Sequence, residues 1–466
     1  MSVLAGRVHI VGVGGAGMSG IARVLLARGV SVSGSDAKES RRLTSLIPLG
    51  AQVYVGHSVE AMLQSGKPDV LVISTAIGQN NLEVKAAHDL GIPVVNRATA
   101  LAELVSGSIG ISVAGTHGKT TTTSMLTVIL QNAGKDPSFV IGSEMNESGS
   151  NAHQGTGDLF VVEADESDGT FLTLPTTAAI VTNVEPDHLN YWKTFEALEQ
   201  AFVDFVVSTA KYEGFAVVCG DDLGARKVGE LASSRGARVI TYGVNAENDA
   251  KVAILPSETA GAVFTITYQG QVYGPIQLAV PGEHNALNAS AAFLTALELG
   301  CSAELAKTGL SEFTGTHRRF EFRGEVAGVR VFDDYAHHPT EINAVLKAAR
   351  VVANGARVLV AFQAHHFYRT ALFSKEFGQA LGLADFVVVL EVFAPGETPI
   401  PGASGSVMAS NVPLEDDAVV FEPSWSAVPS HLVNNARNGD LIITLGAGDI
   451  GMMCPQILDL LSRREQ

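Results

Sequence analysis

The sequence contains few cysteines and few charged residues. Among its 466 residues are three cysteines, Cys219, Cys301 and Cys454, which lie far apart and form no CxxC pair. This excludes a disulfide framework and a structural zinc site, and it fits a reducing cytosol. Charged residues make up 17% of the chain, and its 31 lysines and arginines form no cluster, so we expect no nucleic-acid partner.

Long apolar runs are also missing. No run reaches the about 18 residues that a membrane-spanning helix needs. The apolar segment near the N-terminus is broken by glycines and lacks the basic flank of a signal peptide. With 48 acidic residues the formal net charge is −17, which argues against a basic membrane-binding face. We therefore expect a cytoplasmic protein with no membrane partner.

The sequence is rich in glycine. Its 48 glycines lie at the ends of short apolar runs, as is typical of α/β proteins. Strands buried on both faces are predicted at Val8–Val13, Val70–Ser74, Ile109–Ala114, Leu159–Glu163 and Ala178–Thr182. Helices are predicted between them, for example at Gly17–Arg28 and Thr120–Ala133. This alternation predicts mostly parallel sheets with helices on both faces, and Lys251–Val280 predicts an inserted antiparallel hairpin.

The length predicts three domains at about 150 residues each. We place them at residues 1–107, 108–315 and 316–466, since a new buried strand begins after Ser108. The third domain has predicted strands at Val329–Asp333, Arg357–Phe362, Phe386–Glu391 and Asp440–Leu445.

The first motif is HIVGVGGAGMSG, in which Gly12, Gly14 and Gly17 satisfy GxGxxG between a predicted strand and a predicted helix. Such glycines let a pyrophosphate approach the backbone at a helix N-terminus. Asp36 ends the next predicted strand, where an acid that binds a ribose would stand. Alone, the motif favours a nicotinamide cofactor, although any nucleotide diphosphate meets the same requirements and a purely structural turn is the alternative.

The second motif, ISVAGTHGKTTTTSM, predicts ATP binding. Backbone N–H groups of the Gly115–Lys119 loop would surround the phosphates, Lys119 would supply a charge and Thr120 could hold Mg²⁺. The longer GxxxxGK[ST] pattern requires glycine where Val113 stands, so this is a shorter variant of the loop.

Acidic residues and a histidine follow at the ends of two later strands. In DLFVVEADESD, Glu163 is the preferred magnesium ligand, Asp165 and Glu166 are its competitors, and a solvated acidic loop is the alternative. In VTNVEPDH, His188 could complete a second metal site, or it could be an ordinary surface histidine.

Further polar clusters point to the rest of a nucleotide site. In GEHNALNA, Asn288 offers the donor and acceptor that adenine needs, while helix capping by Asn285 is the alternative. Clusters at Arg318–Arg319, Asp333–His338 and His365–Arg369 flank predicted strands of the third domain, which suggests a site that closes over ATP rather than ordinary surface loops.

Together these motifs resemble those of a known family. GVGGAGMSG, GTHGKTTT, EADESD, VTNVEPDH, GEHNALNA, RRFEF and DDYAHHPTE occur in the order found in the ATP-dependent Mur ligases, and the likeness extends from Gly12 to Arg369. The resemblance implies three domains: an N-terminal Rossmann-like domain for a UDP-sugar, a central P-loop ATPase-type α/β domain, and a C-terminal Rossmann-like domain for the amino acid. It replaces the nicotinamide hypothesis.

The resemblance also implies the reaction, which is ligation of L-alanine to UDP-N-acetylmuramate in peptidoglycan synthesis, with ATP and Mg²⁺. The lactyl carboxylate would pass through an acyl phosphate. A tripeptide-recycling or folylpolyglutamate-type ligase is the nearest alternative, and an ATP-binding regulatory protein is an alternative of another class. The sequence does not indicate an oligomeric state.

The site residues implied by the resemblance fall into five groups. Lys119, His188 and Glu163 would be catalytic, and Thr120, Glu163 and His188 would hold the metal. ATP would be bound by Gly115, Thr116, His117, Gly118, Lys119, Thr120, Thr121, His284, Asn288, Arg319 and Tyr335. The UDP-sugar would be bound by Gly14, Gly15, Ala16, Gly17, Asp36, Ser74, Thr75 and Arg97, and the amino acid by His337, His365 and Arg369.

The chain departs from the family pattern at two places. The family commonly shows FQPH followed by arginine, whereas this chain has FQAH and then His366, so Arg369 is expected to bind the alanine carboxylate alone. Later-step Mur ligases carry a carbamylated lysine, but Val203 occupies the corresponding spacing from His188, as expected of the alanine-adding member.

Overall fold

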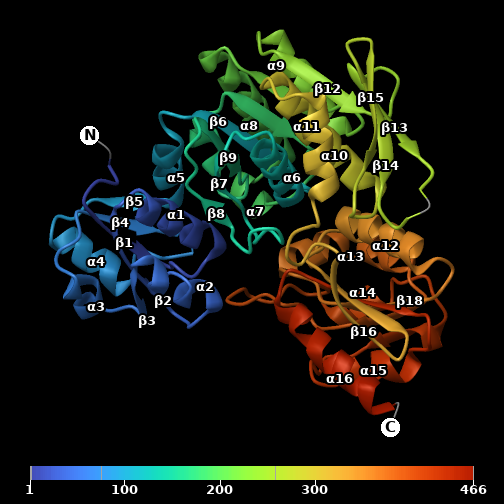
Figure 1. The fold of residues 1–466 in the computed structure, drawn as a ribbon. Coiled ribbons are helices and arrows are strands. Elements are labelled where there is room, and N and C mark those ends of the chain that lie inside the picture. The colour runs from blue at the N-terminus through green and yellow to red at the C-terminus, as the bar shows by residue number, and fades with distance from the viewer. Residues whose placement is uncertain (1–2, 75, 258, 465–466) are drawn as a thin grey trace. The chain divides into compact units, whose positions relative to one another are not determined.

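The computed structural model describes residues 3–74, 76–257 and 259–464 (Figure 1). The described residues form three sheets and divide into two compact units. One unit comprises the described residues up to Ala253, with Phe264–Gln277 and Leu287–Phe313. The other comprises the described residues of Ile254–Val263, with Leu278–Ala286 and those from Thr314 onwards.

The first sheet has the strand order β3-β2-β1-β4-β5, and all its pairs are parallel. Its strands are β1 (Arg7–Val11), β2 (Ser31–Asp36), β3 (Gln52–Val55), β4 (Val70–Ile73) and β5 (Val94–Asn96). Its helices are α1 (Ala16–Ala27), α2 (Arg41–Thr44), η1 (Ile47–Leu49), α3 (Val59–Gln64), α4 (Leu82–Asp89) and α5 (Arg97–Val105). The order reverses beside β1, and ligands of parallel sheets bind where this happens, at the carboxyl ends of the strands.

The central sheet is mixed, with the order β15-β14-β13-β12-β11-β10-β6-β9-β7-β8. Its strands are β6 (Ile109–Ala114), β7 (Ser138–Val140), β8 (Ala152–His153), β9 (Leu159–Glu163), β10 (Ala178–Val181), β11 (Phe215–Cys219), β12 (Val239–Gly243), β13 (Ala250–Leu255), β14 (Val263–Tyr268) and β15 (Gln271–Gln277). The helices between them are α6 (Lys119–Asn132), η2 (Thr170–Thr173), α7 (Leu189–Trp192), α8 (Phe195–Ser208), η3 (Thr209–Tyr212), α9 (Leu223–Ser234), α10 (Glu283–Glu298) and α11 (Ala303–Glu312). Four neighbouring pairs in the middle of this sheet are parallel: β9 with β6, β6 with β10, β10 with β11, and β11 with β12.

The predicted hairpin is formed by β14 and β15. Two residues, Gln269 and Gly270, connect the strands, and both have positive φ, 50° and 79°. Two positive values in a two-residue connection are the mark of a type I′ turn, which suits the twist of antiparallel strands. The hairpin prediction is confirmed.

The third sheet has the order β16-β17-β21-β18-β19-β20 and is parallel except for β16, which runs antiparallel to β17. Its strands are β16 (Glu321–Val326), β17 (Val329–Asp334), β18 (Val358–Phe362), β19 (Phe386–Val389), β20 (Val419–Phe421) and β21 (Leu441–Leu445). Its helices are α12 (Pro339–Ala353), α13 (Phe367–Leu381), α14 (Gly405–Ala409), η4 (Asp416–Ala418), α15 (Val428–Asn435), η5 (Asp449–Met453) and α16 (Cys454–Arg464).

Strand β18 shows why the buried strands have apolar residues at every position of their sequence. Val358, Val360 and Phe362 belong to one apolar core, whereas Leu359 and Ala361 belong to another. Successive side chains of a strand point to opposite faces, so a sheet covered on both faces needs apolar residues at every position. The predicted α/β class with helix-covered parallel sheets is confirmed.

Three further expectations from the sequence can be compared with the structure. No helix in the described part of the chain combines the length and the apolar character needed to cross a membrane. Cys219, Cys301 and Cys454 are buried free thiols. The predicted strand Val8–Val13 ends earlier, at Val11, because Gly12 takes a φ of 81° and turns the chain.

Candidate active site

The segment between β6 and α6 has the backbone shape of a phosphate-binding loop. Gly115 has a φ of 136° and Gly118 a φ of 80°, both in the region that favours glycine. A Cβ at Gly118 would lie 2.6 Å from Oδ1 of Asn288, a buried residue of α10. Because α6 begins at Lys119, its first N–H groups and the positive end of its dipole lie at the loop, which suits an anion.

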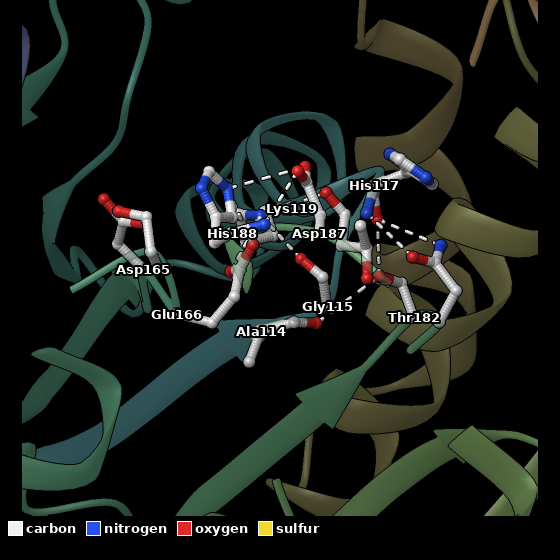
Figure 2. A network of polar contacts seen from close by, with 12 residues as sticks. Ala114, Gly115, His117, Lys119, Asp165, Glu166, Thr182, Asp187 and His188 are labelled. Atoms are coloured by element: carbon white, nitrogen blue, oxygen red, sulfur yellow. Dashed lines mark hydrogen bonds and ion pairs between the residues drawn. The ribbon is translucent and has the colours of Figure 1, made fainter. Parts of the chain in front are cut away.

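Residues that follow β10 hold this loop in place. Oδ1 of Asn183 accepts from the His117 backbone N–H at 2.7 Å, and Nδ2 of Asn183 donates to the His117 carbonyl at 3.2 Å. The Glu185 N–H donates to Oγ1 of Thr116 at 2.9 Å, and the Glu185 carboxylate lies 3.1 Å from Nε2 of His117. Thr182 donates its hydroxyl to the His117 carbonyl as well (Figure 2). The loop is therefore fixed before any phosphate arrives.

Lys119 reaches back across the loop (Figure 2). Its Nζ donates to the carbonyl oxygens of Gly115 and Thr116 at 2.6 and 3.2 Å, and to Oε1 of Glu166 at 2.9 Å. Burial alone would lower the pKa of Lys119, but the carboxylates of Glu166 and Asp165 raise it, so the ammonium stays protonated. Burial raises the pKa of Glu166 to about 7, against the pull of Lys119. An incoming phosphate would compete with Glu166 for this ammonium.

His188 lies beside the same carboxylate. Its Nε2 is 3.7 Å from Oε1 of Glu166 and 3.6 Å from Oδ2 of Asp187. The residue takes a φ of 52° just before α7, a conformation that costs a non-glycine residue about 1–2 kcal/mol. Trp192, at the end of α7, donates its indole N–H to the Glu166 carbonyl at 2.8 Å. Strained residues of this kind cluster at functional sites.

Glu163 has different surroundings. It ends β9, and its Oε2 accepts from the Gly142 N–H at 2.8 Å. It lines a cavity of about 220 Å³, whose wall also includes Gly17, Arg97 and Asp165. The sequence offers three acids as metal ligands. In the structure, Glu166 lies beside His188 and Lys119, whereas Glu163 lies in the wall of the cavity.

Arg97 connects the first sheet to the acidic loop after β9. It begins α5, and its Nη2 donates to Oδ2 of Asp165 at 2.8 Å and to Oδ2 of Asp168 at 2.9 Å. Burial would raise the pKa of Asp165, but Arg97 and Lys119 hold it well below its usual range. Arg97 also lies at the glycine-rich turn, since a Cβ on Gly17 would be 3.3 Å from its Nη1.

The glycine-rich turn after β1 is closed by Asp36. Oδ2 of Asp36 accepts from the Gly14 N–H at 2.9 Å, which stabilises the turn itself. Gly15 precedes α1, and the Ala16 carbonyl accepts from Nδ2 of Asn151 at 2.7 Å. Oγ of Ser74 accepts from the Ala76 N–H at 3.3 Å. The predicted UDP-sugar residue Thr75 lies outside the described residues.

In the other unit, three candidate ATP residues lie near one another. The guanidinium of Arg319 is 5.3 Å from the ring centroid of Tyr335. Burial and the Arg319 charge lower the pKa of His284 to about 4, so its imidazole is neutral at pH 7. Asn285 lies inside α10 and donates Nδ2 to the Pro281 carbonyl at 2.7 Å, so the alternative that it caps this helix is wrong.

The candidate amino-acid residues also lie together in this unit. The rings of His337 and His365 are 6.4 Å apart, and Nη1 of Arg369 donates to the His365 carbonyl at 3.5 Å. Burial, with the charges of His366 and Arg369, lowers the pKa of His365 to about 4. Arg369 is 1% exposed, and its guanidinium lies 5.6 Å from the Tyr368 ring centroid.

Some residues that shape the site are absent from the predicted set. Thr182, Asn183 and Glu185 fix the phosphate loop, and the available signal was their position after a buried strand, in the same motif as His188. Glu397 contacts the start of α13, and nothing in its local sequence, APGET, indicates this.

Comparison with protein-family models gives three matches along the chain. Residues 7–108 match the model described as Mur ligase family, catalytic domain. Residues 113–296 match the Mur ligase middle domain, and residues 318–448 match the Mur ligase, glutamate ligase domain.

Individual relatives match over nearly the full length. The UDP-N-acetylmuramate–L-alanine ligase of Acidothermus cellulolyticus is 55% identical over 99% of this chain and 96% of its own. The ligase of the same name from Mycolicibacterium smegmatis is 47% identical over 98% of this chain and 96% of its own. Among solved structures, the UDP-N-acetylmuramate–alanine ligase of Thermotoga maritima superposes with a TM-score of 0.81 at 28% identity, covering 98% of this chain and 99% of that one.

Proposed function

This chain belongs to the Mur ligase family, and from that premise we infer that it joins L-alanine to UDP-N-acetylmuramate in peptidoglycan synthesis, using ATP. The observation that carries the inference is the full-length likeness to relatives named for this reaction. Its fold is the three-domain α/β fold of that family. The three family models support domains at residues 1–107, 108–315 and 316–466, for the UDP-sugar, ATP and the amino acid.

The chemistry proposed is activation of a carboxylate by phosphoryl transfer. A lactyl carboxylate oxygen attacks the γ-phosphorus of ATP, and ADP leaves with the bridging oxygen and its electron pair. The amine of L-alanine then attacks the acyl phosphate carbon, and phosphate departs as the amide forms and the nitrogen loses its proton. Catalysis of this kind rests on positioning and charge stabilisation.

ATP phosphates would be bound by the residues 115–121, of which Lys119 supplies the cation. The fixed loop backbone and the protonated Lys119 support this role. Asn288 packs against the loop at Gly118. His284, Arg319 and Tyr335 are the proposed nucleoside contacts of the other unit.

A magnesium ion fits the residues present, since hydroxyl and carboxylate oxygens are its preferred ligands. Thr120 is buried in the first turn of α6, and Glu163 is paired in register with Val113 at the end of β6. Glu163 is also close enough for its charge to raise the pKa of Lys119. Thr120 and Glu163 would hold this ion, and His188 would complete a second metal site. Metal bound there would neutralise charge on the transferring phosphoryl group.

The other substrates are assigned to two groups of residues. The UDP-sugar is proposed to bind at the glycine-rich turn, because α1 offers its N-terminal N–H groups to a diphosphate there. The other residues proposed for this substrate are Asp36, Ser74, Thr75 and Arg97. His337, His365 and Arg369 are proposed to bind L-alanine, because a buried guanidinium pairs well with a carboxylate.

The test is phosphate release from ATP with each substrate omitted in turn. We expect release only when UDP-N-acetylmuramate and L-alanine are both present, and a product heavier than the UDP-sugar by one alanyl residue in mass spectrometry. Release with UDP-N-acetylmuramate and a tripeptide, but not with L-alanine, would contradict the proposal and indicate a recycling ligase. ATP binding without any release would indicate a regulatory protein.

A further inference from the structure

The start of α13 is bordered by the segment that follows β19 in the chain. The His366 N–H donates to the Phe393 carbonyl at 3.1 Å, and the Phe393 N–H donates to the Ala364 carbonyl at 2.9 Å. The ring of His365 stacks on Phe393 with centroids 5.7 Å apart and planes inclined by 22°. Residues 392–397 therefore form a strap along the chain that leads into α13.

Glu397 fastens the end of this strap. One carboxylate oxygen contacts Nδ1 of His366, and the other accepts from the Phe367 N–H at 3.0 Å. His366 directly precedes α13 and has a φ of 71°, a conformation that a non-glycine residue keeps only where its surroundings hold it. We call this two-point contact the His366–Glu397 clasp.

The clasp adjoins the residues proposed to bind the amino acid. His365 is its neighbour in the chain, and Arg369 lies in the first turn of α13. The helix has non-helical dihedral angles at Phe373, so its first part is a short segment of its own. A short segment depends on contacts at its beginning for its orientation.

We propose that the His366–Glu397 clasp positions His365 and Arg369, so that the affinity for the amino acid depends on the protonation of the clasp while that for ATP does not. His366 thus acts as a positioning residue and does not bind the carboxylate itself. The proposal rests on the proposed function, since it assigns a role within the same amino-acid site.

The charges around the clasp support the inference that the affinity for the amino acid depends on the imidazole of His366. Burial would raise the pKa of Glu397, but the Phe367 N–H and His366 lower it, so it is ionised at pH 7. His365, with its pKa near 4, is neutral, and Arg369 stays cationic. Two further rings lie nearby: the uncharged ring of Tyr368, 5.5 Å from that of His366, and the ring of His337, 6.4 Å from that of His365. A histidine–carboxylate contact becomes a full ion pair only when the imidazole is protonated.

The experiment compares the KM for L-alanine and for ATP between pH 6 and 9 in four enzymes: wild type, His366→Ala, His366→Arg and Glu397→Gln. The titration of free alanine is common to all four and cancels in the ratio of each variant to wild type. At pH 6 we expect His366→Ala and Glu397→Gln to raise the alanine KM about tenfold, as loss of a charged hydrogen bond would, and the ratio to approach one at pH 9.

His366→Arg gives the decisive outcome, because it keeps a cation opposite Glu397 at every pH. Its alanine KM should match wild type at pH 6 and become lower than wild type at pH 9. The ATP KM should stay unchanged throughout. A ratio to wild type that stays flat with pH in His366→Arg would mean that another group titrates, with His337 the next to test, and would overturn the proposal.

A matched control exists in the same unit, where Nε2 of His431 lies 3.0 Å from the Glu422 carboxylate on a different part of the surface. His431→Ala should leave both KM values unchanged at every pH. If wild type forms no alanine-dependent phosphate, the proposed function fails; if it does but the four enzymes share one pH profile, only the clasp fails.

Discussion

At the scale of single residues, Lys119 offers the sharpest test of the phosphate chemistry. Lys119→Ala should lower the ligation rate several hundredfold, or about 3–4 kcal/mol, because one preorganised charge at the transferring phosphoryl group is lost. UDP-sugar binding, measured by calorimetry, should stay near wild type, since the residues proposed for it lie at the turn after β1, at the end of β2 and at the start of α5. Lys227→Ala, which removes another lysine–glutamate contact, is the control. Equal weakening of UDP-sugar and ATP binding would contradict the assignment.

The roles of Glu163 and Glu166 can be separated in the same way. Glu163→Gln keeps the shape but removes a charge from a hard-cation site, so the magnesium concentration for half-maximal rate should rise sharply. Glu166→Gln should leave that concentration near wild type and instead affect ATP binding, because Glu166 competes with phosphate for Lys119. The titration of rate against magnesium decides between them. A shift in Glu166→Gln alone would make Glu166 the ligand.

At the scale of the elements, most strands could be predicted and most side-chain partnerships could not. β6 and β9 begin and end where predicted, because a strand buried on both faces leaves an unbroken apolar run that glycine or acid terminates. Glu397 could not be predicted, since its contact with His366 depends on two strand ends meeting in space. Likewise, the acidic motif indicated a charged site, but only the structure separates Glu163 from Glu166.

Helix α4 is joined to the first sheet by a buried polar cluster around Glu83. This carboxylate is fully buried, accepts from Oγ of Ser35 at 2.6 Å, and lies 3.2 Å from Nδ1 of His57 and 3.6 Å from Nε2 of His9. Burial would raise the pKa of Glu83, but His9 and Ser35 lower it below its ordinary value. A carboxyl with a lowered folded pKa stabilises the fold above its unfolded pKa, and this contribution is lost as pH falls through the folded value.

Wild type should therefore lose stability to urea as pH falls below about 4.5, the ordinary glutamate range. Glu83→Gln should cost about 1.5–3 kcal/mol at pH 7, as expected for a charged buried hydrogen bond, and should weaken the pH dependence. Urea midpoints at pH 7 and pH 4 measure both effects. Glu60→Gln, an exposed position on α3, should match wild type. Identical midpoints for Glu83→Gln and wild type at pH 7 would refute the role of the cluster.

At the scale of the whole molecule, the three free cysteines report on folding. Cys219, Cys301 and Cys454 are each at most 5% exposed, and burial raises the pKa of Cys219 and Cys454 to about 11. Since the thiolate is the reactive form, a disulfide reagent at pH 8 should label the native protein slowly and all three thiols at once in denaturant. Rapid labelling of one thiol in the native protein would show that its surroundings open locally.

The position of β21 has a consequence for how the protein folds during its synthesis. This strand lies between β17 and β18 although it follows both in the chain. On the ribosome, β17 and β18 therefore emerge without the strand that joins them. At about 5–20 residues per second, the interval before Leu441 lasts roughly 4–16 seconds. A stop codon in that interval would release a chain whose two facing strand edges have no partner, and such edges are where nascent chains aggregate.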